Sequence, residues 1–486
     1  PVEKPGESAF GFPQAADLSR IFPADPTNAN TTLVASPTNV VANGSTTSSL
    51  TVTLADATGN LLSTSDGTVA LSSTGSATIS AVTDNNNGTY TATVTNTVAE
   101  SVTISGTLDG AAITDTAAIT FTVGAADPTN ANTTLVASPT NVVANGSTTS
   151  SLTVTLADAT GNLLSTSDGT VALSSTGSAT ISAVTDNNNG TYTATVTNTV
   201  AESVTISGTL DGAAITDTAA ITFTVGAADP TNANTTLVAS PTNVVANGST
   251  TSSLTVTLAD ATGNLLSTSD GTVALSSTGS ATISAVTDNN NGTYTATVTN
   301  TVAESVTISG TLDGAAITDT AAITFTVGAA DPTNANTTLV ASPTNVVANG
   351  STTSSLTVTL ADATGNLLST SDGTVALSST GSATISAVTD NNNGTYTATV
   401  TNTVAESVTI SGTLDGAAIT DTAAITFTVG AADPTNANTT LVASPTNVVA
   451  NGSTTSSLTV TLADATGNLL STSDGTVALS STGSAT

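Results

Sequence analysis

The sequence contains no cysteine, histidine, methionine or tryptophan. Without cysteine and histidine, the chain has no disulfide, no thiolate nucleophile, no imidazole base and no zinc ligands of the usual kind. Basic residues are almost absent too, with 2 against 34 acidic residues, which gives a net charge of −32. Contacts to phosphate depend on Lys and Arg, so we expect neither nucleic acid nor an anionic lipid surface as a partner.

Long apolar runs are also missing, although 38% of the residues are hydrophobic. No run approaches the roughly 20 apolar residues that a helix needs to cross a bilayer, so we expect no membrane-spanning segment. The apolar residues are mostly Ala, Val, Ile and Leu, and most polar residues are Thr, Ser and Asn. Abundant β-branched residues favour strands and argue against a disordered chain.

An internal repeat organises most of the chain. The segment DPTNANTTLVASPTNVVANG begins at Asp25 and returns without substitution every 102 residues. We predict a non-repeat segment at 1–24, complete repeats at 25–126, 127–228, 229–330 and 331–432, and a truncated repeat at 433–486. The period exceeds the roughly 20–50 residues of solenoid repeats and suits one small domain per copy. We therefore expect beads on a string, each with its own core.

Within each repeat the apolar residues recur with period two. In the copy at 127–228, Leu152, Val154 and Leu156 alternate with polar residues, and the segments that hold Tyr192 and Phe223 follow the same pattern. Such alternation predicts strands with one buried and one solvated face. Turn signals such as Asn-Gly and Asp-Gly separate about seven short strands. The sequence thus predicts an all-β fold of tandem immunoglobulin-like β-sandwiches, with Tyr192 and Phe223 buried.

Three segments of each repeat carry a family resemblance. The order VVANG, SLTVTLADATGN and GSATISAVTDNNNGTYTATVTNTVAESVTISGTLDG resembles the bacterial immunoglobulin-like domains of invasins and intimins. This resemblance covers every complete repeat and implies a surface-exposed rod that holds a binding tip away from a cell. The piece around Tyr192, NNGTYTA, also resembles the tyrosine corner of Ig sandwiches, in which the tyrosine hydroxyl bonds to nearby backbone.

The side chains of the repeats are poorly suited to catalysis. Most acidic residues of a repeat lie in turns, where Asp is favoured for its hydrogen bonds to local backbone. A serine nucleophile would find neither His nor Lys within the repeats to act as its base. We therefore predict that the chain is not an enzyme, and we assign no catalytic or cofactor-binding residues. The acidic residues of one repeat are Asp127, Asp158, Asp168, Asp186, Glu202, Asp211 and Asp217.

Two places could hold calcium. The loop from Asp186 to Gly190, DNNNG, places oxygen ligands at alternate positions but lacks the distal bidentate Glu, and a hairpin turn explains the same residues. The junction 126–132, which contains Asp127, is placed like the calcium-stiffened junctions of cadherin-like rods, but an ordinary linker restricted by Pro128 also explains it. We favour the turn and the linker and predict no metal site, with calcium at Asp127 or Asp186 as the alternative.

Identical copies suit a role that sets length, because one more copy changes reach and nothing else. We predict a structural spacer or stalk of an extracellular, cell-surface adhesin or filament. With about 3.3 Å per strand residue, a bead with its linker should be roughly 40 Å long. Two alternatives stay open: a repeated low-affinity binding module that acts through avidity, and a filament subunit that polymerises by strand addition.

The two ends of the sequence depart from the repeat. Residues 1–24 contain both basic residues, Lys4 and Arg20, together with three Phe and four Pro. This composition predicts either a connector or a docking segment for a cell-surface anchor or neighbouring chains. The truncated repeat stops halfway, and half a sandwich leaves an apolar face uncovered. We therefore expect the chain to continue beyond Thr486.

Overall fold

The computed structural model describes residues 22–486, which form strands and turns. In the first repeat the strands are β1 Thr32–Ser36, β2 Asn39–Val41, β3 Ser48–Thr53, β4 Val69–Ser73, β5 Thr78–Ile79, β6 Thr83–Asp84, β7 Thr89–Thr95, β8 Ser101–Leu108, β9 Ala111–Ala112 and β10 Ala117–Thr122. In the second they are β11 Thr134–Ser138, β12 Asn141–Val143, β13 Ser150–Thr155, β14 Val171–Ser175, β15 Thr180–Ile181, β16 Thr185–Asp186, β17 Thr191–Thr197, β18 Ser203–Leu210, β19 Ala213–Ala214 and β20 Ala219–Thr224. Strands β21–β30 and β31–β40 occupy the equivalent positions of the next two repeats. Among residues 22–486 no helix is long and apolar enough to cross a membrane.

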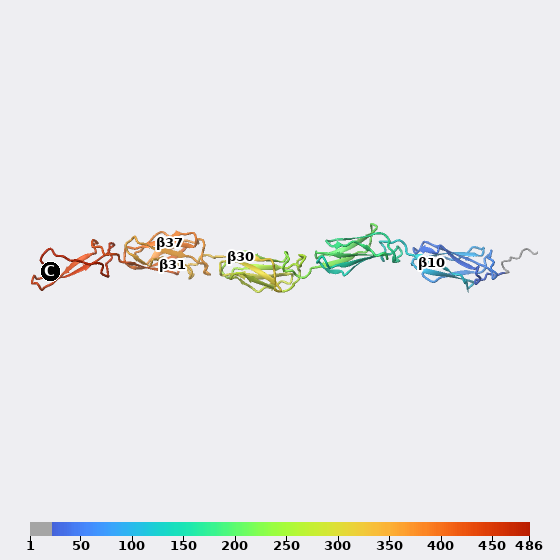
Figure 1. The fold of residues 1–486 in the computed structure, drawn as a ribbon, viewed down its shortest axis with the longest axis horizontal. Helices are drawn as coiled ribbons and strands as arrows, with labels where there is room; N and C mark the ends of the chain where they lie inside the picture. The colour runs from blue at the N-terminus through green and yellow to red at the C-terminus, as the bar shows by residue number, and fades with distance from the viewer. Residues whose placement is uncertain (1–21) are drawn as a thin grey trace, which may run out of the picture. The chain divides into compact units, whose positions relative to one another are not determined.

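Each complete repeat is built from two five-stranded sheets (Figure 1). In the second repeat, one sheet has the order β11-β13-β17-β15, with β16 also paired to β17, and the other has the order β12-β20-β18-β14, with β19 paired to β18. Neighbours are antiparallel except β12 and β20, which run parallel. The prediction of tandem Ig-like β-sandwiches is therefore confirmed. The count of about seven strands was too low, because three strands of two residues are too short for a periodic pattern.

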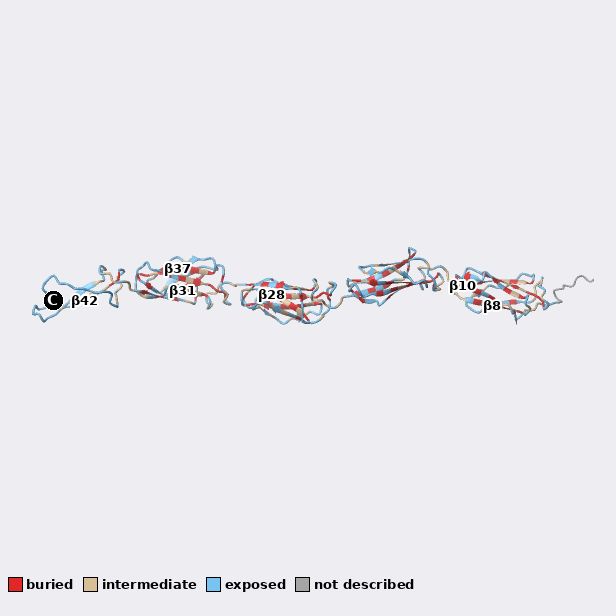
Figure 2. Cartoon of the chain, viewed as in Figure 1, coloured by how far each residue is buried: buried red, intermediate tan, exposed pale blue. Residues whose placement is uncertain are grey.

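The core of each complete repeat lies between its two sheets, where the alternating apolar residues meet (Figure 2). Leu152, Val154 and Leu156 are fully buried, and the Thr residues between them remain partly exposed. Tyr192 and Phe223 are buried as predicted. Period-two alternation places every second side chain on the same face of a strand, and for these strands that face is the interior of the sandwich.

The described chain divides into two compact units, one ending at Gly226 and one comprising Ala227–Thr486. The first unit holds two complete repeats, and the second holds two more and the truncated copy. In the truncated copy, β41 (Thr440–Ser444) pairs only with β42 (Ser457–Thr461). Leu441 is 58% exposed and Leu458 is 53% exposed, whereas their counterparts in the complete repeats are buried. The predicted docking segment 1–24 lies outside the described residues except for its last three.

Candidate functional site

The junction at 126–132, predicted as a possible linker, is folded onto the second repeat. The backbone N–H of Asp127 donates to the carbonyl of Ala157 at 2.8 Å, and the hydroxyl of Thr133 donates to the carbonyl of Asp127 at 2.7 Å. The Asp127 carboxylate accepts the hydroxyl and the backbone N–H of Thr129, and these bonds lower the pKa of Asp127. This segment is therefore an ordered part of the second repeat and not a free linker.

The loop that contains Asp186 is an exposed turn between β16 and β17. The Asp186 carboxylate accepts the backbone N–H of Asn188 at 2.8 Å and the hydroxyl of Ser167 at 2.7 Å. Asn188 has φ of 58°, a left-handed conformation that Asn tolerates in turns. Both candidate calcium carboxylates are thus hydrogen-bonded to neighbouring residues of their own repeat. Over residues 22–486, no three Asp or Glu side chains are grouped closely enough to hold a metal ion.

The remaining acidic residues of the repeat hold backbone groups in place. Each of four carboxylates accepts a backbone N–H from a segment distant in sequence, at 2.6–2.9 Å. The pairs are Asp168 with Ala126, Asp211 with Thr170, Asp217 with Leu135, and Glu202 with Ser178. A carboxylate is a strong acceptor for a backbone N–H, and such bonds tie loops to the sandwich. These residues therefore act as structural acceptors in a chain that has few other charged groups.

Tyr192 uses its hydroxyl to hold a turn. The hydroxyl donates to the carbonyl of Gly169 at 2.9 Å, and burial of the ring raises the pKa of Tyr192. The bond to backbone agrees with the resemblance to a tyrosine corner. However, its acceptor lies 23 residues earlier in the sequence, in the Asp168-Gly169 turn before β14. Tyr192 thus fastens this turn to the central strand β17.

A turn at one end of the second repeat forms a polar site with several side-chain hydrogen bonds. We call residues Asp158–Asn162 and the equivalent segments of the other repeats the joint turn. Asp158 is only 2% exposed, and its carboxylate accepts the hydroxyl of Thr160 at 2.8 Å and the side-chain amide of Asn162 at 3.0 Å. Burial raises the pKa of Asp158, but hydrogen bonds from Asn162, Gly124 and Thr160 outweigh burial and lower this pKa to about 2.

The joint turn also binds the preceding repeat. The Asp158 carboxylate accepts the backbone N–H of Gly124 at 2.9 Å, and the Thr160 hydroxyl donates to the carbonyl of Ala42 at 2.7 Å. Asn162 makes two such bonds, since its amide donates to the carbonyl of Thr97 and its oxygen accepts the N–H of Ala99. Four hydrogen bonds of the joint turn therefore fasten the second repeat to the first, and all of them use backbone groups of the first repeat.

The same four bonds recur inside the second unit. The joint turn of the fourth repeat bonds to the third repeat, and that of the truncated copy bonds to the fourth, with distances of 2.8–2.9 Å throughout. These bonds join Asp362 to Gly328, Thr364 to Ala246, Asn366 to Thr301 and Ala303, Asp464 to Gly430, Thr466 to Ala348, and Asn468 to Thr403 and Ala405. In the first repeat, Asp56, Thr58 and Asn60 keep the internal bonds of this turn. The first repeat thus offers a chemically identical turn that precedes the three joints described here.

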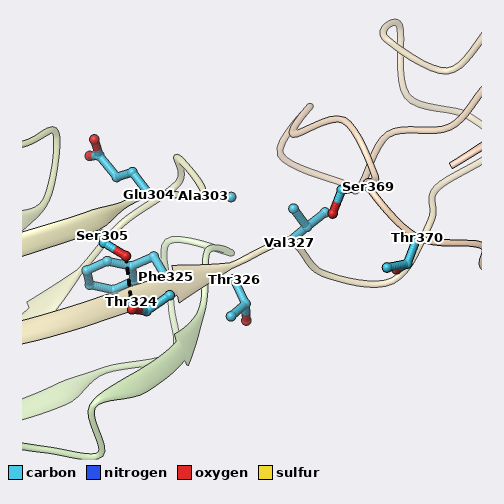
Figure 3. A pocket seen from close by; sticks show the side chains of 9 residues that line it. All are labelled: Ala303, Glu304, Ser305, Thr324, Phe325, Thr326, Val327, Ser369 and Thr370. Carbon is cyan, nitrogen blue, oxygen red and sulfur yellow. Dashed lines mark hydrogen bonds between the residues drawn. The ribbon is translucent and has the colours of Figure 1, made fainter. Parts of the chain in front are cut away.

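An open groove of about 440 Å³ lies beside the joint between the third and fourth repeats (Figure 3). The strand end at Phe325 lines one side, and Ser369 and Thr370 of the next repeat line the other. Phe325 is buried and offers no ring face, and the hydroxyls of Ser305 and Thr324 bond to each other at 3.0 Å. The groove therefore presents no aromatic surface, which weighs against a ligand site anchored by an aromatic side chain here.

From the sequence, the joint turn could be predicted only as a local turn. Asp followed by Gly and Asn indicates a local turn, and the internal bonds of Asp158 agree with that interpretation. No local pattern could reveal the acceptors at Ala42 and Thr97, because they lie 118 and 65 residues away from their donors. One signal was available in hindsight: Thr160 and Asn162 add side-chain hydrogen-bonding groups that a simple turn does not need.

The match to a known protein family agrees with this architecture. The family described as Invasin, domain 3 matches residues 27–124, 129–226, 231–328 and 333–430. Among solved structures, the Escherichia coli adhesin FdeC is similar at 24% identity, with 62% of this chain and 98% of that chain covered and a TM-score of 0.38. Invasin, a bacterial integrin-binding protein, is 22% identical, with 85% and 82% covered and a TM-score of 0.38. InvD of Yersinia pseudotuberculosis is 24% identical, with 61% and 96% covered and a TM-score of 0.36. No curated protein matches the chain significantly in sequence.

Proposed function

Because the chain belongs to the Invasin, domain 3 family of bacterial Ig-like domains, we propose that it is a structural spacer or stalk of an extracellular surface adhesin. The observation that carries this proposal is the joint turn. Within each unit, the same side chains fasten one repeat to the backbone of the repeat before it. A joint that is built from the same residues in both units would allow a chain to gain length by adding further copies.

The surface of the repeats also suits a spacer. An adhesin segment that only sets distance has no need for a ligand site, and the two aromatic residues of each complete repeat are buried. Binding surfaces that act through avidity usually present aromatic or Arg side chains as anchors. Both basic residues of this chain lie in residues 1–24, and the repeats carry only acidic charge. Mutual repulsion between acidic repeats should keep the chain soluble.

Solution scattering of a shortened chain tests this function. Deletion of residues 229–330 joins two segments of identical sequence, so every junction keeps its natural residues. We expect the maximum dimension to fall by roughly 40 Å, the estimated length of one bead. Circular dichroism of both chains serves as the control for folding. A maximum dimension that does not change would contradict the spacer proposal, because the repeats would then not add length.

A further inference from the structure

Strands β2 and β10 join the two ends of the first repeat. They pair in parallel with the register Asn39↔Thr120, Val40↔Phe121 and Val41↔Thr122, whereas the other strand pairs of that repeat are antiparallel. Strand β2 follows directly after β1 at the start of the repeat, and β10 is its last strand. The beginning and the end of each folded repeat are therefore hydrogen-bonded to one another.

The contact between these strands is compact and shielded from water on one side. The N–H of Thr120 donates to the carbonyl of Thr38, and the N–H of Ala42 donates to the carbonyl of Thr122, both at 2.8 Å. On the inner face, Val40 is 3% exposed and Phe121 is 2% exposed. Hydrogen bonds beside such residues meet little competition from solvent, which strengthens them.

The direction of the strands decides how the pair responds to tension. A pull on the ends of the chain acts on β2 through its start and on β10 through its end. Because the strands are parallel, these two forces point in opposite directions along one axis and slide the strands past each other. All hydrogen bonds between β2 and β10 then carry the load together. In an antiparallel hairpin pulled at its open end, the bonds would instead break one after another.

Strand β1 does not take over the load from the pairing of β2 with β10. It pairs antiparallel with β3 in the other sheet, and tension must separate it from β3 before the force reaches β2. After that step, the pairing of β2 with β10 is the direct connection between the two loaded ends. The same parallel pairing recurs in the other complete repeats, between β12 and β20, β22 (Asn243–Val245) and β30 (Ala321–Thr326), and β32 (Asn345–Val347) and β40 (Ala423–Thr428).

We propose that the parallel pair formed by the second and last strands of each repeat is a mechanical clamp, which lets the chain carry tension. This function goes beyond the spacer proposal and does not depend on it, because a spacer that is never pulled needs no clamp. Scattering measures reach, and force spectroscopy measures resistance, so either proposal can fail while the other stands.

Single-molecule force spectroscopy of the whole chain, held at its two ends, tests the clamp. Four complete repeats should give four rupture events of similar force. Each event should release about 300 Å of chain, because the segment held by the clamp runs from Asn39 to Thr122 and an extended residue spans at most about 3.6 Å. A substitution in the first repeat alone leaves three events as internal standards.

Two proline variants separate the clamp from the rest of the sandwich. Ala42→Pro removes the N–H that donates to Thr122. One of the four events should then fall in force by roughly a quarter, since about four bonds share the load in a parallel ladder of this length. Val41→Pro is the control, because donors alternate along a strand and the N–H of Val41 points to the open edge of the sheet. Equal forces in the two variants would overturn the proposal.

If proline prevents the first repeat from folding, a second pair of variants still tests whether rupture begins at the clamp. Val40→Thr and Val102→Thr introduce the same hydroxyl at two buried positions, one in β2 and one in the inner strand β8. Both should lower the melting temperature of the repeat. Only Val40→Thr should lower the force of one event, because β8 lies outside the clamp. If Val102→Thr lowers the force equally, rupture does not begin at the clamp and the proposal is wrong.

Discussion

Replacing Asp158 with Asn isolates one hydrogen bond of the joint, that between the Asp158 carboxylate and the N–H of Gly124. The matched variant Asp56→Asn alters the same internal bonds in the identical turn of the first repeat. Only Asp158→Asn also removes the acceptor of Gly124. A hydrogen bond to a charged group contributes about 1.5–3 kcal/mol. We therefore expect Asp158→Asn to lower the free energy of unfolding of the first two repeats by that much more than Asp56→Asn does.

Tyrosine fluorescence during urea unfolding measures this difference. The chain has four Tyr and no Trp, and each complete repeat contains one Tyr. In a background with Tyr294→Phe and Tyr396→Phe, only Tyr90 and Tyr192 report, so the signal comes from the two repeats at this joint. With a slope of about 1–3 kcal/mol per M of urea, the extra loss should shift the midpoint by about 1 M. Identical midpoints for the two Asn variants would show that the bond to Gly124 contributes nothing to stability.

Three further predictions concern acid, the core and calcium. The folded pKa of Asp158 is about 2, against an ordinary value of 3.8, so the stabilising contribution of its carboxylate is present above pH 4 and is lost as the pH falls through the folded pKa. The melting temperature measured as a function of pH should show this loss, and Asp158→Asn should make the loss smaller. Phe223→Ala should destabilise its own repeat by about 3–5 kcal/mol in urea unfolding, and a cost below 1 kcal/mol would contradict the burial of that ring. Removal of calcium with a chelator should leave the melting temperature unchanged, whereas a large drop would identify Asp127 or Asp186 as a metal ligand.

The strands and the core could be predicted because they depend on local pattern. The alternation around Leu152 and Tyr192 fixes which face of each strand is apolar, and only a sandwich buries two such faces against each other. The short strands β15, β16 and β19 could not be predicted, because two residues carry no periodic signal. Their pairing follows from the positions of the longer strands β17 and β18 beside them.

The polar contacts between repeats could not be predicted from local sequence patterns. Asp158 looks like any turn Asp in the sequence, and the neighbouring repeat supplies the N–H of Gly124 that its carboxylate accepts. The segment after Asp127 looked like a linker because it contains Pro and Asn, residues common in loops. It is ordered because Thr133 and Ala157 of the second repeat bond to it. Both features depend on groups brought together by the tertiary fold.

Distances between two spin labels placed across the joint measure most directly whether the joint turn holds neighbouring repeats together. The chain has no cysteine, so Thr93→Cys and Thr195→Cys, at exposed positions of the first and second repeats, provide unique labelling sites. We expect a narrow distance distribution in the parent chain and a clearly broader one after Thr160→Val with Asn162→Ala, which removes three of the four bonds. The same pair of substitutions at Thr58 and Asn60 should leave the distribution narrow. A broad distribution in the parent chain, or equal broadening by both pairs, would contradict the role assigned to the joint turn.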